Sequence, residues 1–162
     1  MTTPTRLTAA DFEAFLQQPE NVDRRFERID GEIVEKMPNA LHAYLVALLL
    51  HALVGYLKER PLGYAGAEAR FLLGTEGQHD LIPDVAVWRS RPSEAPLTES
   101  PLLAIEVQSP NQSDQFMLRK AQLYLQHGCP LVWLVYPRLK LVEVFTPTER
   151  HLLSMGETLR GG

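Results

Sequence analysis

Hydrophobic and polar residues in the N-terminal part of the chain follow first a helical period and then the alternation typical of strands. A short helix is predicted over residues 8–18, with Thr8 as N-cap and Asp11 at the third helical position, as in a capping box. Two alternating runs then flank Asp30-Gly31, a pair that supplies the positive φ angles of a tight type I′ turn. The pattern therefore predicts a β-hairpin after the first helix.

A second helical pattern extends from about Ala40 to Arg60, where Pro61 ends it. Its central stretch, LVALLLHALVGYL, is the most apolar part of the sequence. The stretch is too short to span a bilayer and contains His51, so we expect a buried helix and no membrane association.

The rest of the sequence predicts strands with one more helix among them. Strands are expected at residues 63–74, at the run that follows Asp84, and at residues 102–109, 131–137 and 139–147; a helix is expected at 113–127, a polar loop at 75–82 and a surface loop at 89–101. The strand-helix-strand order over residues 102–137 predicts a right-handed parallel crossover, and the last strand should return antiparallel. The sum is one α/β domain with a mixed sheet.

Composition and charge narrow the class of protein. The 162 residues, 45% hydrophobic and 22% charged, suit one ordinary globular domain. The single cysteine, Cys129, cannot form an internal disulfide, and the first residues lack the pattern of a secretory signal, so we expect a cytoplasmic protein. The net charge of −4 argues against a dedicated high-affinity nucleic-acid binder, but it does not exclude an enzyme whose acids are neutralised by metal.

Two acids stand in apolar runs, where an unpaired charge is costly to bury. Asp84 directly precedes the run Val85–Trp88, and Glu106 lies inside the stretch LLAIEVQSP. If their strands are neighbours, the two carboxylates can converge. Two carboxylates, a backbone carbonyl and water would suit Mg²⁺ or Mn²⁺, and such an ion supports phosphodiester hydrolysis. Alternatively, either acid lies at a strand end and meets water or an arginine.

Several stretches in this order resemble the Uma family of restriction endonucleases, within the PD-(D/E)XK nuclease superfamily. They are FERIDGEIVEKMPNALHAYL, PDVAVW, AIEVQSP and RKAQLYLQHGCPLVWLVYP, and the resemblance covers roughly residues 25–146. It implies a single restriction-endonuclease-like domain over residues 1–162, with a central mixed β-sheet flanked by α-helices. The N-terminal helix and hairpin would occupy residues 8–37, and the nuclease-like core would occupy about 40–146.

The resemblance also implies a chemistry. Asp84, Glu106 and the backbone carbonyl of Val107 would bind Mg²⁺ or Mn²⁺, the substrate would be DNA, and the protein would be a homodimer. The superfamily pattern places lysine two residues after the second acid, where this chain has Gln108. Glutamine can orient water or a phosphate, but it brings no positive charge.

The resemblance implies that a lysine from the following helix substitutes, and Lys120 occupies that place. Lys120, Tyr124 and His127 share one helix face by spacing, although spacing leaves open whether that face meets the acids. A solvent-exposed helix cation is the plain alternative for Lys120, and packing in the core or at its rim is the alternative for Tyr124.

The resemblance makes Glu32 a better candidate than Glu27 for an additional acid, although a place on a surface hairpin is the plainer explanation. His42 lies where the family often has a histidine, but a histidine alone in a helix is more often structural than catalytic. His79 and Asp80 could support the acids or simply belong to a loop.

Three hypotheses follow. The first is a divalent-metal-dependent endonuclease that cleaves DNA; Asp84, Glu106 and Lys120 together favour it. The second is an inactive module of the same fold that binds nucleic acid or a protein partner, which Gln108 and the acidic balance favour. A third, weaker one is a metal-dependent hydrolase of small phosphoesters.

Overall fold

The computed structural model describes residues 6–75 and 77–160. Its helices and strands are α1 (Ala9–Leu16), the 3₁₀ helix η1 (Pro19–Asn21), β1 (Phe26–Ile29), β2 (Glu32–Glu35), α2 (Ala40–Glu59), β3 (Tyr64–Ala67), β4 (Phe71–Leu73), β5 (His79–Leu81), β6 (Val85–Trp88), β7 (Leu103–Val107), α3 (Asp114–Gln126), β8 (Val132–Tyr136), β9 (Leu141–Phe145) and β10 (Arg150–Leu153).

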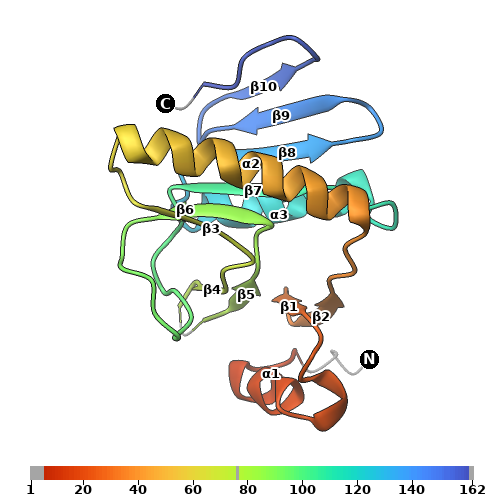
Figure 1. The fold of residues 1–162 in the computed structure, drawn as a ribbon. Coiled ribbons are helices and arrows are strands. Elements are labelled where there is room, and N and C mark those ends of the chain that lie inside the picture. The colour runs from red at the N-terminus through yellow and green to blue at the C-terminus, as the bar shows by residue number, and fades with distance from the viewer. Residues whose placement is uncertain (1–5, 76, 161–162) are drawn as a thin grey trace.

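A six-stranded mixed sheet, in the order β10-β9-β8-β7-β6-β3, forms the centre of the molecule. Its one parallel pair is β7 with β8, which confirms the predicted crossover through α3, and β9 returns antiparallel to β8 as expected. Helix α2 lies across one face of this sheet, and α3 lies on the other (Figure 1). The predicted mixed sheet flanked by helices is therefore confirmed.

The alternation of side chains in β6 and β7 separates two hydrophobic cores. Val85 and Ile105 belong to the core beneath α2, whereas Ala86 and Ala104 belong to the core beneath α3. Glu106 follows the parity of Ala104, so its side chain points toward α3. The strand pattern therefore decides which helix can supply a partner for this acid.

The N-terminal elements form as the sequence predicts. Thr8 and Asp11 make both hydrogen bonds of a capping box at the start of α1. Asp30 and Gly31, with φ angles of 53° and 84°, form the turn between the antiparallel strands β1 and β2. This hairpin belongs to a second sheet of four strands, in the order β2-β1-β5-β4.

Two predictions between residues 63 and 82 were wrong. The segment predicted as one strand is divided into β3 and β4, which belong to different sheets. The chain turns between them at Glu68, a non-glycine residue with a φ angle of 54°. The predicted polar loop contains β5, whose Asp80 is buried and bound by Arg70 Nε at 2.8 Å. Strand β5 is stabilised by its pairing with β1 and β4 and by this ion pair. The local sequence signals neither of these.

The prediction that the second helix is buried was also wrong. Only His42 of α2 is buried; the side facing the sheet is partly covered, and the opposite side is exposed. The helix is long and apolar enough to cross a membrane, by length and composition alone, but its residues Leu49 and Leu53 pack against the sheet core. The apolar sequence of this helix therefore predicted more burial against the rest of the protein than the structure has.

Candidate active site

Asp84 and Glu106 lie on neighbouring strands. The antiparallel pairing of β6 and β7 ends where Val85 faces Ile105, and Asp84 and Glu106 are the next residues of the two chain segments. The backbone N–H of Val107 donates a hydrogen bond to Asp84 Oδ2 at 2.7 Å. Both carboxylates are 2% exposed, so each needs partners in the interior.

Asp84 is held by two side chains from the segment that follows the hairpin. Lys36 Nζ donates to Asp84 Oδ1 at 2.7 Å and to the carbonyl of Ile82 at 2.5 Å. His42 Nε2 lies 3.0 Å from Asp84 Oδ2. Asn39 caps α2 by accepting the N–H of His42, which fixes the first turn of the helix beside Asp84. Both oxygens of Asp84 are therefore engaged.

Glu106 is held by two side chains from α3. Lys120 Nζ lies 2.7 Å from Glu106 Oε1, and the Tyr124 hydroxyl donates to the same oxygen at 2.7 Å. Lys120, with no exposed surface, also binds Glu27 of β1 at 2.8 and 3.0 Å. Glu27 in turn accepts the N–H of Ile82. The face of α3 that carries Lys120 and Tyr124 thus meets the acids.

Burial and the neighbouring charges set the protonation of this cluster. Burial raises the pKa of Glu106, and Lys120 only partly offsets that rise. Burial also acts to raise the pKa of Asp84, but His42, Lys36 and Lys120 together bring it well below the usual range. The pKa of Lys120 is raised, because Glu106 and Glu27 outweigh the effect of its burial. Asp84 is therefore the firmly ionised acid of the pair.

Two other predicted site residues, Gln108 and Glu32, are placed differently. Gln108 is half-buried and donates to Asp114 Oδ1 at 2.7 Å and to the carbonyl of Gln112, so it points toward the start of α3. Glu32 is exposed at the beginning of β2, whereas Glu27 of β1 is the acid that the hairpin brings to Lys120. A catalytic role for Gln108 or Glu32 stays a prediction.

Sequence reasoning missed Lys36 and Glu27. Lys36 directly follows a half-exposed hairpin strand, and nothing in that pattern signals a buried ammonium. Glu27 did carry a signal, because it stands between Phe26 and Arg28-Ile29 in a strand that is buried on both faces. The burial of this strand depends on β5 and α3, and the local sequence pattern does not show that they pack there.

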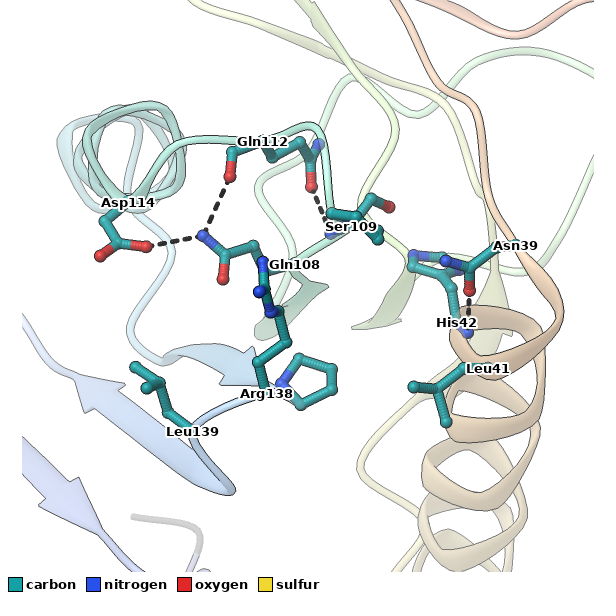
Figure 2. A pocket seen from close by; sticks show the side chains of 11 residues that line it. Asn39, Leu41, His42, Gln108, Ser109, Gln112, Asp114, Arg138 and Leu139 are labelled. Atoms are coloured by element: carbon teal, nitrogen blue, oxygen red, sulfur yellow. Dashed lines mark hydrogen bonds between the residues drawn. The ribbon is translucent and has the colours of Figure 1, made fainter.

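A pocket of about 480 Å³ has His42, the partner of Asp84, in its lining, but neither Asp84 nor Glu106 lines it. Figure 2 shows it between the first turn of α2, the start of α3 and the turn after β8. His42, Gln108 and Arg138 are among its lining residues, and among the described residues Arg138 has no ion-pair partner. Two helix N-termini and Arg138 offer this pocket donors for an anion, Asp114 adds one carboxylate, and His42 connects the pocket to Asp84.

Comparisons with known proteins identify the family and the fold of the chain. Residues 12–161 match the Uma2 family, described as "Putative restriction endonuclease". The chain belongs to the Uma2 family. No curated protein matches the sequence. The chain is also similar to a solved structure titled a putative nuclease belonging to DUF820, from Anabaena variabilis, with a TM-score of 0.77 and 24% identity over 93% of this chain and 87% of that one. At that identity, the likeness establishes the fold.

Membership in Uma2 raises the question of a divalent ion. Residues 6–75 and 77–160 contain no group of three or more His, Cys, Asp or Glu residues placed to hold a metal. Asp84 and Glu106 nevertheless offer carboxylate oxygens at neighbouring strands of one sheet, the donor type that Mg²⁺ and Mn²⁺ prefer. These oxygens are engaged by ammonium groups and by His42. The chemistry of this donor pair therefore suits a divalent ion.

Proposed function

We propose that this Uma2 protein is a divalent-metal-dependent endonuclease that hydrolyses DNA phosphodiester bonds. The observation that carries the proposal is the pair Asp84 and Glu106 on adjacent strands, connected through His42 to a pocket with two helix N-termini and Arg138. Family membership supports a nuclease activity. His42 connects this pocket to Asp84, and Arg138 and the two helix N-termini offer donors for a phosphate.

The side chains have distinct roles in this proposal. Asp84, Glu106 and the carbonyl of Val107 would hold Mg²⁺ or Mn²⁺, which when bound supplies an activated water and neutralises charge on the phosphoryl group. Arg138 and the N-termini of α2 and α3 would hold the phosphate. Tyr124 and Lys120 orient Glu106 from α3. For Lys120 to reach a phosphate itself, its ammonium would have to leave Glu27 or Glu106.

DNA cleavage tests the proposal directly. Plasmid and single-stranded DNA are incubated with Mn²⁺ and the parent, Asp84→Asn, or Asp23→Asn, whose exposed acid lies outside the site. We expect Asp84→Asn to cut on the order of a hundredfold more slowly or worse, the scale of losing one catalytic group, and Asp23→Asn to match the parent. A parent that never exceeds Asp84→Asn on any nucleic acid would refute the activity.

The charge balance of the cluster favours a second candidate. Lys36 and Lys120 already neutralise two of the three buried acids, Glu27, Asp84 and Glu106. A protein that is neutralised internally folds without metal, so the same residues would also suit an inactive module that binds nucleic acid or a protein partner. In that case the pocket still binds DNA, but Mn²⁺ produces no cleavage.

We further propose that the protein acts as a homodimer through α2. Leu41, Tyr44 and Leu48 form an exposed stripe at helical spacing, and no Asp, Glu, Lys or Arg occurs between Lys36 and Lys58. Apolar stripes of this kind on a surface mark interaction sites. A second copy fits because two α2 helices packed antiparallel bring opposite dipole ends together. Cleavage of both DNA strands would then use one site from each copy.

A further inference from the structure

Lys36 has an unusual position for a lysine next to a hairpin. Its side chain is 6% exposed, and its Nζ lies 2.7 Å from Asp84 Oδ1 and 2.5 Å from the carbonyl of Ile82. A carboxylate oxygen and a backbone carbonyl are the ligand types that hard divalent cations take. The ammonium of Lys36 thus occupies a place with the ligands of a cation.

Both oxygens of Asp84 already have partners. Oδ1 accepts Lys36, while Oδ2 accepts the N–H of Val107 and lies 3.0 Å from His42 Nε2. The Val107 bond joins two strands of the sheet, and His42 is fixed in the first turn of α2 by Asn39. Lys36 is the partner of Asp84 that carries a full positive charge on a long, flexible side chain.

The other buried ammonium is held more tightly. Lys120 has no exposed surface, and it bridges Glu27 and Glu106 from within α3. Lys36, in contrast, lies in the connection between β2 and α2, followed by the exposed residues Met37, Pro38 and Asn39. Rotating the side chain of Lys36 toward this exposed segment breaks no helix or strand.

We propose that Lys36 is a built-in counter-cation of Asp84, and that a divalent ion binds the acids by displacing its ammonium. This inference rests on the metal site of the proposed function. A positive charge 2.7 Å from Asp84 repels an incoming cation and competes for the same oxygen. The metal-free protein is therefore stable, and its metal affinity is held down by its own lysine.

Calorimetric titration with Mn²⁺ measures the competition without DNA. The proteins are the parent, Lys36→Met, Lys58→Met as a control at an exposed lysine of α2, and Asp84→Asn as the blank. We expect Lys36→Met to bind Mn²⁺ roughly tenfold more tightly or better than the parent, because the repelling charge is gone. Lys58→Met should match the parent, and Asp84→Asn should bind little.

Equal affinity of Lys36→Met and the parent overturns the inference, and so does the absence of binding to both. If Lys36→Met does not fold, Lys36→Gln removes the charge and keeps a hydrogen-bond donor. A protein that shows the tenfold gain but never cleaves DNA supports this inference and refutes only the nuclease activity. The two proposals therefore fail separately.

A second measurement uses the unaltered protein. Reductive methylation followed by peptide mass mapping reports which lysines are accessible, with and without saturating Mg²⁺. We expect Lys36 to be protected without metal and methylated with it. Lys120 should stay protected in both conditions, and Lys58 should react in both. Protection of Lys36 that is unchanged by Mg²⁺ at saturation would overturn the displacement.

Discussion

At the scale of single residues, the site depends on how three buried acids share their positive partners. Lys120 forms ion pairs with Glu27 and Glu106, and Lys36 forms an ion pair with Asp84. Removing one member of a buried pair leaves the other charge without compensation, which is far more costly than losing a surface ion pair. Each of these residues therefore affects folding as well as chemistry.

Glu27 and Glu32 of the hairpin give a matched test of whether the buried ion pairs contribute to stability. Glu27→Gln leaves Lys120 with one carboxylate fewer, and we expect the free energy of unfolding to fall by about 3–5 kcal/mol. Glu32→Gln, at an exposed position, should change it by no more than about 0.5 kcal/mol. Urea unfolding monitored by circular dichroism measures both. Similar effects of the two substitutions would mean that Glu27 is not part of a buried network.

Arg138 gives a residue-scale test of the pocket. Its side chain is exposed at the pocket, so Arg138→Ala should leave folding unchanged and weaken DNA binding. If the guanidinium binds one phosphate, the slope of log K against log salt should fall by about 1. Fluorescence anisotropy at several salt concentrations measures the slope. Arg91→Ala, in the exposed loop before β7, is the control, and an equal loss in both would place the DNA elsewhere.

At the scale of helices and strands, local sequence signals were reliable where the structure is local. The capping box at Thr8, the Asp-Gly turn and the crossover through α3 all form as predicted. The division of residues 63–74 into two strands was not predictable in this way, because it depends on pairing with β6 and β5. The buried strand β5 was missed for the same reason.

Strand β5 also carries a titratable group that tests its packing. His79 is buried, and its Nδ1 accepts the backbone N–H of Asp30 at the hairpin turn. Burial lowers the pKa of His79 below its ordinary value of 6.5. The unfolded chain therefore binds this proton more readily than the folded one. The resulting stability is complete above pH 6.5 and is lost as the pH falls through the lowered value.

Substitution separates this contribution from the general effect of acid. We expect the parent to lose more stability than His79→Gln between pH 7.5 and pH 5, because the variant has no imidazole to protonate at this position. His51→Gln, at an exposed histidine of α2, should follow the parent. The readout is the free energy of unfolding in urea at each pH. Parallel curves for the parent and His79→Gln would contradict the role of His79.

At the scale of the whole molecule, the candidate site was predictable only in part. The acids could be recognised because Asp84 and Glu106 interrupt apolar strands, and the structure sets those strands side by side. Lys36, Glu27 and the contact of His42 with Asp84 arise only when the hairpin and α2 close over the sheet. Local patterns do not encode that closure. The exposed side of α2 is the other feature that only the assembled molecule shows.

That exposed side predicts the oligomeric state. If two copies pair through α2, Leu48→Glu places a charge within the interface, where an unpaired carboxylate is costly to bury. We expect the parent to have twice the 18.3 kDa mass of one chain by size exclusion with light scattering, and Leu48→Glu to have the mass of one. Leu152→Glu is the matched control, because Leu152 is comparably exposed but lies on β10, away from α2 in the sequence. Circular dichroism confirms that each variant is folded. A parent that elutes as a single chain would contradict the dimer, and dissociation by Leu152→Glu alone would move the interface to β10.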